Sequence, residues 1–377
     1  YSSAASDVYK RQNIYRVMNM FEKRIKKACA MLNELGADAL LLLNESNMHY
    51  FCGFSPSEGA ILIFKNGEGA HIVDSRYTEA AENHAKETGL RVYEITSKFT
   101  DTVKELCSKA GVKAIAFEDE TITLKSYGAY KAATGCDFIE IGNRLMKIRN
   151  VKDEKELEYM VNANAIAEKS LEELQNHIKP GKTEKELQAF FDYLMLQNGS
   201  DGVSFDTILL TGAHTSLPHG VASDKIIQKG DFVLIDFGAT YMGYHSDMTR
   251  TFAVGTATEE MKEAYELVLR AQLAGIKALA PGEKCANVYK AAYNVLEEKQ
   301  MGKYFRHSLG HGVGLDIHEG YNASPRSTDV FEAGNVTSIE PGIYLPNKFG
   351  IRIEDVCVVT ENGNKDISEF PKEFTVL

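Results

Sequence analysis

The sequence lacks long hydrophobic runs and any excess of positive charge. No apolar stretch approaches the roughly 18 residues that indicate a membrane-spanning helix. Lysine and arginine number 42 against 53 aspartates and glutamates, which gives a formal net charge of -11. Because phosphate binding requires a basic surface, this balance argues against a nucleic-acid partner. We therefore expect neither a membrane protein nor a nucleic-acid-binding protein.

Cysteine motifs and a secretory signal are also missing. The chain has six cysteines without CxxC or Cys/His spacing: Cys29, Cys52, Cys107, Cys136, Cys285 and Cys357. This pattern predicts reduced, mostly buried thiols in a cytoplasmic protein. Residues 1–12 lack the apolar core of a secretory signal and resemble a translated sequencing adapter. We expect them to be a non-native or disordered tail, with the natural start at Met18 or Met20.

The length and the composition fit two globular domains. At 377 residues the chain is long for a single core, and its hydrophobic and charged fractions of 44% and 25% are ordinary for a globular protein. Helical and strand-like segments alternate from a helix over 21–35, through a hairpin joined at Asn66-Gly67, to about Lys147. This alternation predicts an α/β domain with a mixed sheet over 13–147. Residues 148–377 form the second predicted domain.

The second predicted domain repeats its own pattern. A break between two helices at Pro180-Gly181, followed by a capping box at Thr183 to Glu186, has a counterpart around Pro281-Gly282. Each helix pair is followed by strands that carry two carboxylates. We therefore predict an internally duplicated domain, in which two α+β halves face each other around a site on a pseudo-twofold axis.

Five side chains with metal-binding groups occur in the last third of the chain: Asp236, Asp247, His311, Glu340 and Glu354. The two aspartates and the two glutamates each lie in a pair of β-rich runs that predicts an antiparallel hairpin. Like carboxylates a few Å apart cannot all ionise, so convergence of these groups would require cations. Oxygen-rich ligands with one imidazole favour hard divalent ions such as Mn²⁺, with Co²⁺, Fe²⁺ or Zn²⁺ as alternatives.

The same residues carry a family resemblance. Their order resembles the creatinase/methionine-aminopeptidase superfamily, and within it the Xaa-Pro peptidases, aminopeptidase P and prolidase. Four further motifs support it: PHG at 218–220, HSLGHGVGLDIHE at 307–319, EPGIY at 340–344 and GIRIED at 350–355. The resemblance covers nearly the whole chain. It implies a creatinase-type α/β N-terminal domain and an α+β pita-bread catalytic domain with internal pseudo-twofold duplication.

The activity that the resemblance implies is a dinuclear-metal exopeptidase. Its substrates would be proline-containing peptides, cut at an N-terminal Xaa-Pro bond, or Xaa-Pro dipeptides. Asp236 would chelate one ion, Asp247 and Glu354 would bridge the pair, and His311 and Glu340 would complete the other site. A water between the ions would be the nucleophile, and Glu340 would accept its proton. The alternative for Glu340 is a ligand without a proton role.

Four other residues are predicted to act on the substrate. By resemblance, His219 binds substrate or stabilises the intermediate, and His318 contacts the scissile peptide and its developing oxyanion. His307 matches an extra histidine of aminopeptidase P and prolidase, with a buried structural imidazole as the alternative. Arg352 is either a substrate contact or a fixed counter-ion for the carboxylates.

Some residues near the motifs have other predicted roles. His245 is better interpreted as part of the pocket wall than as a ligand, and Asp316 and Asp355 as structural residues that face away. The segment Gly320-Tyr321-Asn322 departs from the family pattern of a small residue followed by proline, which leaves substrate preference open.

Alternative functions share this fold. A creatinase-like amidino hydrolase works without metal, and a peptide-binding module would have lost the ligands, whereas all five are present here. A methionine aminopeptidase is disfavoured by the additional N-terminal domain. The sequence does not decide between aminopeptidase P and prolidase. Relatives use the N-terminal domain for dimer contacts, so we expect a homodimer.

Overall fold

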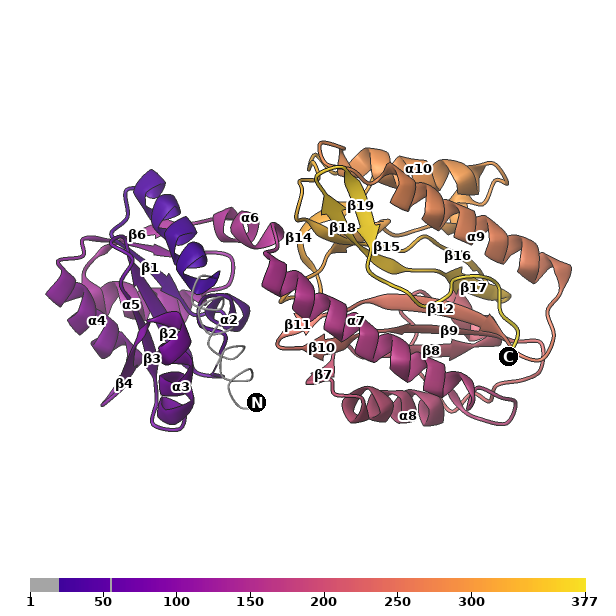
Figure 1. The fold of residues 1–377 in the computed structure, drawn as a ribbon, viewed down its shortest axis with the longest axis horizontal. Coiled ribbons are helices and arrows are strands. Elements are labelled where there is room, and N and C mark those ends of the chain that lie inside the picture. Colours follow the sequence, from indigo (N-terminus) through magenta and orange to yellow (C-terminus); the bar gives the residue numbers. More distant parts are fainter. Residues whose placement is uncertain (1–19, 55) are drawn as a thin grey trace, which may run out of the picture. The chain divides into compact units, whose positions relative to one another are not determined.

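The computed structural model describes residues 20–54 and 56–377, so the predicted tail over 1–12 lies outside the described residues. The chain divides into two compact units, with the division between Ile148 and Arg149 (Figure 1). Each unit has its own sheets and its own hydrophobic core.

The first unit is an α/β domain with one six-stranded sheet, in the order β4-β3-β2-β1-β5-β6. Strand β1 pairs antiparallel with β2 and parallel with β5, so the predicted mixed sheet is confirmed. The strands are β1 (Ala39–Leu42), β2 (Gly59–Phe64), β3 (Gly69–Val73), β4 (Arg91–Glu94), β5 (Ala114–Phe117) and β6 (Asp137–Glu140). The helices are a run over 20–35, α2 (Glu45–Cys52), α3 (Thr78–Thr88), α4 (Phe99–Ala110) and α5 (Leu124–Thr134).

Helix α2 is absent from the predicted elements. The Asn44 side chain caps it by accepting a hydrogen bond from the Asn47 N–H, and Gly53 ends it with a φ of 67°. Its last three residues, from Tyr50 to Cys52, are all buried. The helix therefore lacks the one-sided apolar stripe by which a helix is recognised.

The second unit consists of two halves, each with a helix pair packed on antiparallel strands (Figure 1). Helices α7 and α8 share a core with β8, β9 and β12, while α9 and α10 share another with β14 to β18. This confirms the predicted duplicated α+β fold. The helices are α6 (Arg144–Asn150), which begins before the unit boundary, α7 (Glu154–Gln175), α8 (Glu184–Gln197), α9 (Glu259–Ala278) and α10 (Cys285–Glu297), with η1 (Gly212–Ser216) and η2 (Gly302–Tyr304) as single turns.

The strands of the second unit form two main sheets, in the orders β12-β9-β8 and β14-β13-β15-β18-β19. The first-half strands are β7 (Gly202–Val203), β8 (Ile208–Thr211), β9 (Phe232–Phe237), β10 (Ala239–Tyr241), β11 (Tyr244–His245) and β12 (Met248–Ala253). The second-half strands are β13 (Gly310–Gly312), β14 (Glu319–Ala323), β15 (Val336–Ile339), β16 (Gly342–Leu345), β17 (Phe349–Arg352), β18 (Asp355–Thr360) and β19 (Gly363–Asp366).

The predicted Pro-Gly breaks separate the paired helices. Gly181 lies between α7 and α8 with a φ of 96°, and Gly282 lies between α9 and α10 with a φ of 83°. The predicted capping box of Thr183 and Glu186 opens α8. Across the described residues, every helix is too short or too polar to cross a membrane.

The two hairpins that carry the carboxylates are interrupted, whereas the sequence pattern predicts continuous ones. Strand β9 pairs with β12, which places Asp236 opposite Thr249, but the chain between them leaves this sheet to form the short hairpin β10–β11. Gly238 permits the departure, because a Cβ at this position would lie 2.0 Å from the Ser246 carbonyl oxygen. In the second half β15 pairs with β18, while β16 pairs with β17. Asp247 and both predicted glutamate ligands therefore lie at strand breaks.

Replacing Gly238 with alanine should destabilise the second unit, because its Cβ would overlap the backbone at Ser246. Overpacking of this kind costs about 1–3 kcal/mol. We expect Gly238→Ala to lower the free energy of unfolding in urea by roughly that amount. Gly202→Ala is the control, since its Cβ would lie 3.5 Å from Thr240 Oγ1, an ordinary contact. Equal losses in both variants would contradict the close approach at Gly238.

Candidate metal centre

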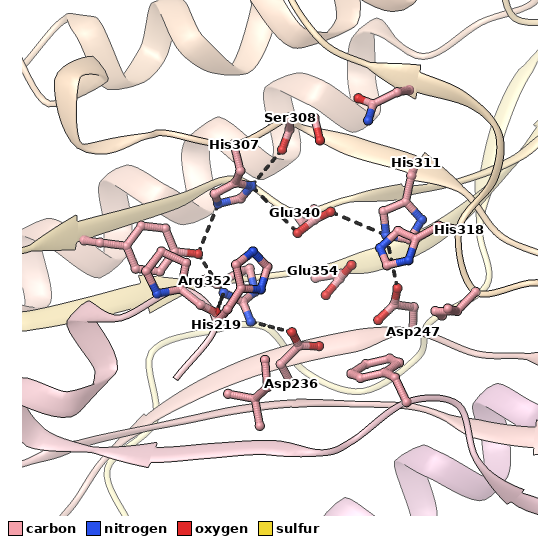
Figure 2. A pocket seen from close by; sticks show the side chains of 16 residues that line it. His219, Asp236, Asp247, His307, Ser308, His311, His318, Glu340, Arg352 and Glu354 are labelled. Carbon is pink, nitrogen blue, oxygen red and sulfur yellow. Dashed lines mark hydrogen bonds and ion pairs between the residues drawn. The ribbon is translucent and has the colours of Figure 1, made fainter. Parts of the chain in front are cut away.

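A pocket of about 330 Å³ in the second unit brings together all nine residues that the sequence analysis assigns to the site (Figure 2). They are His219, Asp236, Asp247, His307, His311, His318, Glu340, Arg352 and Glu354. Apolar and aromatic walls are added by Phe205, Ile208, Pro218, Ile317 and Tyr344. The pocket thus combines a charged floor with walls that can hold an apolar side chain.

The ends of strands position the five predicted ligands. Asp236 lies on β9, and Asp247 immediately precedes β12. Glu340 lies between β15 and β16, and Glu354 between β17 and β18. His311 lies on β13 at an irregularity of its pairing with β14. At such breaks the side chain is released from the strict alternation of a sheet, so all five can point into one pocket.

Direct contacts between the two halves bring the aspartates to the glutamates. The Glu354 N–H donates to the Thr249 carbonyl oxygen at 3.2 Å, and Thr249 Oγ1 donates to Glu354 Oε2 at 2.7 Å. Two residues further along the first-half strand, Thr251 Oγ1 donates to the Arg352 carbonyl oxygen at 3.0 Å. Strand β12 therefore runs against the segment that carries Arg352 and Glu354.

His311 lies at the centre of the ligand group. Its Nε2 is 3.4 Å from Asp247 Oδ2 and 3.6 Å from Glu340 Oε1. Its Nδ1 is 3.1 Å from the Gly312 carbonyl oxygen, which places the proton on Nδ1 and leaves the Nε2 lone pair for a metal. Burial lowers the pKa of His311 to about 4, so the ring is neutral. Asp247, His311 and Glu354 each offer a ligand atom within 4.8 Å of the others.

The carboxyl groups in the pocket repel one another. Burial and then the charge of Glu354 raise the pKa of Asp247 and of Glu340 well above the ordinary range. Burial and then Asp236 raise the pKa of Glu354 to about 8. Arg352 opposes these shifts, but it supplies a single positive charge against four carboxyl groups. Without further cations, some of these groups must hold protons at neutral pH.

An unpaired oxygen supports the presence of cations. Asp236 Oδ2 accepts a hydrogen bond from Arg352 Nη2 at 2.5 Å, whereas Asp236 Oδ1 is buried without a hydrogen-bond partner among the described residues. A buried carboxylate oxygen without a partner is costly. Divalent ions would satisfy this oxygen and relieve the repulsion, so the residues present fit a metal centre.

The predicted substrate histidines also line the pocket. The ring of His318 lies 4.1 Å, centroid to centroid, from the ring of His311 (Figure 2). His219 follows Pro218 in the loop after η1 and lies near Arg352 in the close view (Figure 2). Both imidazoles therefore lie in the same pocket as the five predicted ligands.

His307 and Arg352 belong to a shared hydrogen-bond network. The Tyr344 hydroxyl lies 3.0 Å from His307 Nε2 and accepts from Arg352 Nη1 at 2.7 Å. His307 Nδ1 lies 2.8 Å from the Ser308 carbonyl oxygen. Burial and then Arg352 lower the pKa of His307 to about 3, so this ring is neutral. Arg352 contacts Asp236, as expected for the counter-ion alternative.

Two residues of the site have no role in the sequence analysis. Tyr344 links His307 to Arg352, and its place in the EPGIY motif was the available signal. Thr249 donates to Glu354 and accepts from Arg352 Nε at 3.0 Å. Nothing in the sequence around Thr249 distinguishes it from other strand threonines.

Three neighbouring residues lie apart from the pocket. His245 is not among the residues that line it, so the predicted wall position is wrong. Burial lowers the pKa of the His245 ring, and the charges of Asp316 and Glu319 oppose this shift. Asp316 accepts from Arg149 Nη2 at 2.8 Å, and Asp355 pairs with Arg250 Nη2 at 2.7 Å. The structural interpretation of both aspartates agrees with these contacts.

The duplicated fold and the carboxylate-histidine centre define a metal-dependent peptidase of the pita-bread type. Residues 158–361 match metallopeptidase family M24, and residues 24–151 match the creatinase/prolidase N-terminal domain. The chain belongs to metallopeptidase family M24.

Named relatives cover almost the whole chain. An Xaa-Pro dipeptidase of Pyrococcus horikoshii is 36% identical over 360 residues, 94% of this chain and 99% of that protein. The solved structure of an Xaa-Pro dipeptidase from Bacillus anthracis has a TM-score of 0.91 at 37% identity and covers 95% of this chain and 100% of its own. An X-Pro aminopeptidase from Thermotoga maritima has a TM-score of 0.88 at 38% identity, covering 92% and 100%.

The raised pKa of Glu354 predicts how the metal-free protein responds to pH. Because its folded pKa of about 8 exceeds the ordinary value of 4.5, its stabilising contribution is complete below pH 4.5 and is lost as pH rises through about 8. Chelator-treated protein should therefore be less stable at pH 8 than at pH 6 in urea unfolding. Glu354→Gln should reduce this difference, whereas the exposed control Glu361→Gln should not. If Glu354→Gln kept the full stability difference between pH 6 and pH 8, the raised pKa of Glu354 would not be its cause.

Proposed function

We propose that this protein is a metal-dependent exopeptidase that hydrolyses the bond between any residue and a following proline. The convergence of four carboxylates, His311 and three further histidines in one pocket carries the proposal. The proteins named above support the Xaa-Pro specificity, since both Xaa-Pro dipeptidases and an X-Pro aminopeptidase are 36–38% identical to this chain. Xaa-Pro dipeptides are the first substrates to test.

The proposed ligands divide as the family resemblance implies. Asp236 would hold one divalent ion, Asp247 and Glu354 would bridge two, and His311 and Glu340 would hold the second. When bound, such ions polarise the scissile carbonyl and lower the pKa of a water molecule. We propose Mn²⁺ as the resident metal, because four carboxylates and one imidazole form a hard ligand set.

Side chains around the ligands would then handle protons and charge. Glu340 would accept the proton of the attacking water and pass it to the leaving proline nitrogen. His318 and His219 would donate hydrogen bonds where negative charge grows on the substrate oxygen. His307 and Arg352 would contact the substrate, and Arg352 would also hold Asp236.

The assembly and the location are further parts of the proposal. The six free cysteines support a reducing compartment, and we propose the cytoplasm. We also propose a homodimer, as the resemblance implies. The creatinase-like, metal-independent alternative is disfavoured, because Asp236 Oδ1 is buried without a hydrogen-bond partner in the part of the chain that the structure describes, and a metal ion would satisfy it.

A substrate panel tests the activity. We expect hydrolysis of Ala-Pro with Mn²⁺ and loss of hydrolysis with chelator, because the ligand group cannot act without its ions. Ala-Pro-Ala distinguishes an aminopeptidase from a dipeptidase, while creatine and a methionyl peptide test the other activities known for this fold. Turnover of Ala-Pro that survives complete removal of metal would overturn the proposal.

Two substitutions separate the ligands from the substrate residues. Asp247→Asn should lose bound metal and activity together, because its carboxylate would bridge the ions. His318→Ala should keep its metal content, measured by elemental analysis, while kcat falls by roughly 100-fold, as when an oxyanion donor is removed. Both variants should retain the circular dichroism of the unmodified protein. Full metal content in Asp247→Asn would contradict the bridging role.

A further inference from the structure

A buried carboxylate directly follows His318 in the chain. Glu319 is 5% exposed and accepts hydrogen bonds from Arg149 Nη2, from Lys152 Nζ at 2.6 Å and from the Asp316 N–H at 3.2 Å. Arg149 also donates to the Asp316 carboxylate at 2.8 Å. The group thus contains two cations and two carboxylates, and none of these four residues is a proposed metal ligand.

The ion group keeps Glu319 charged in the protein interior. Burial alone would raise the pKa of this carboxyl, but the charges of Lys152 and Arg149 lower it to about 2. A buried ion pair of this kind is weak evidence for stability, because desolvation offsets most of the attraction. The position of this ion group relative to the pocket is therefore more informative about its role than its contribution to stability.

Glu319 and His318 point to opposite sides of the chain. Glu319 begins β14, and neighbouring side chains of an extended chain alternate in direction. His318 accordingly lines the pocket, with its ring 4.1 Å from that of His311, while Glu319 points to the buried cations. Glu319 pairs with Gly312 between β14 and β13. His318 directly precedes Glu319, and His311 directly precedes Gly312, so this one pair connects the backbones that carry the two histidines.

The loop between the two histidines closes around the Glu319 carboxylate. A Cβ on Gly314 would lie 2.3 Å from Glu319 Oε1, and a Cβ on Gly312 would lie 2.1 Å from the Glu319 carbonyl oxygen. The Asp316 N–H donates to the same carboxylate. The backbone at Gly314 and Asp316 therefore packs on this one side chain, while Gly312 packs on the Glu319 backbone, so Glu319 supports the loop that ends at His318.

The segment that supplies the cations is itself anchored beside the pocket. The Lys152 N–H donates to the Gly334 carbonyl oxygen at 2.9 Å, and Asn335 Nδ2 donates to the Asn150 carbonyl oxygen at 3.1 Å. Residues 334 and 335 immediately precede β15, the strand that leads to Glu340. Segment 149–152 thus contacts both the loop that carries His318 and the turn before β15, the strand that leads to Glu340.

We propose that Glu319, held by Arg149 and Lys152, is a positioning residue that fixes the imidazole of His318 against His311. This inference rests on the proposed function for its catalytic consequence. Its structural content, the placement of the His318 ring, is independent of the reaction.

A double-mutant cycle tests the inference. Glu319→Gln keeps the shape of the side chain and removes the charge that binds the two cations. We expect kcat on Ala-Pro to fall by roughly 10- to 100-fold with KM and metal content nearly unchanged, as for a displaced catalytic group. In the His318→Ala background the same substitution should have almost no further effect on kcat, since the group that it positions is absent. Equal losses in both backgrounds would overturn the proposal.

A matched control and a structural measurement complete the experiment. Glu168→Gln is the same chemical change in the same unit, at a carboxylate that accepts the N–H groups of Glu369 and Phe370, and it should leave kcat unchanged. A crystal structure of Glu319→Gln should show the rings of His318 and His311 moved apart. If they keep their separation, the proposal is wrong, whether or not the protein hydrolyses Ala-Pro. Absence of Ala-Pro hydrolysis in the unmodified protein would count only against the proposed function.

Discussion

Four carboxyl groups face one another across a pocket in which Arg352 is the permanent cation. Such a group cannot be fully ionised on its own, and burial removes the water that would otherwise screen it. The raised pKa values of Asp247, Glu340 and Glu354 result from this repulsion and from burial. Asp236 Oδ1 has no hydrogen-bond partner among the described residues, so it is the oxygen that a cation would stabilise most directly. The pocket is therefore built for bound cations, and its unfavourable charge is what gives it affinity for them.

The fold brings these ligands together from two halves, each with a hydrophobic core around its own helix pair. Each half has its own helix pair, so the apolar burial that stabilises it is independent of the pocket. The halves are then joined by hydrogen bonds between β12 and the segment around Glu354, where Thr249 and Thr251 supply both backbone and hydroxyl partners. The strand breaks free the ligand side chains from the alternation of the sheets, while the paired strands beside them hold the backbone from which these side chains extend.

The sequence predicts the helix pairs, the mixed sheet of the first unit and the residues that meet in the pocket, because each depends on a local pattern or a recognisable motif. It does not predict that the first hairpin is interrupted, since the departing chain depends on a close approach of Gly238 to the Ser246 backbone beyond the β10–β11 hairpin. The wall position predicted for His245 is wrong at the same place, because His245 lies on the short hairpin β10–β11 and not on β12. Thr249 and Arg149 were missed because their partners lie far away in the chain, and no spacing rule connects them.

The two histidines that would act on substrate are supported differently from the metal ligands. The ligands lie on strands or at their ends, but His219 and His318 lie in loops, which are intrinsically more mobile. Each loop is tied to a buried carboxylate. Glu184, at the start of α8, accepts from the Thr211 N–H at 2.7 Å and the Ser223 N–H at 2.9 Å, at the two ends of the segment that carries His219. Glu319 holds the loop that carries His318. A hydrogen-bond donor stabilises developing charge only if it is already in place, so a loop can carry such a donor when an interior ion pair or hydrogen-bond network replaces the rigidity of a strand.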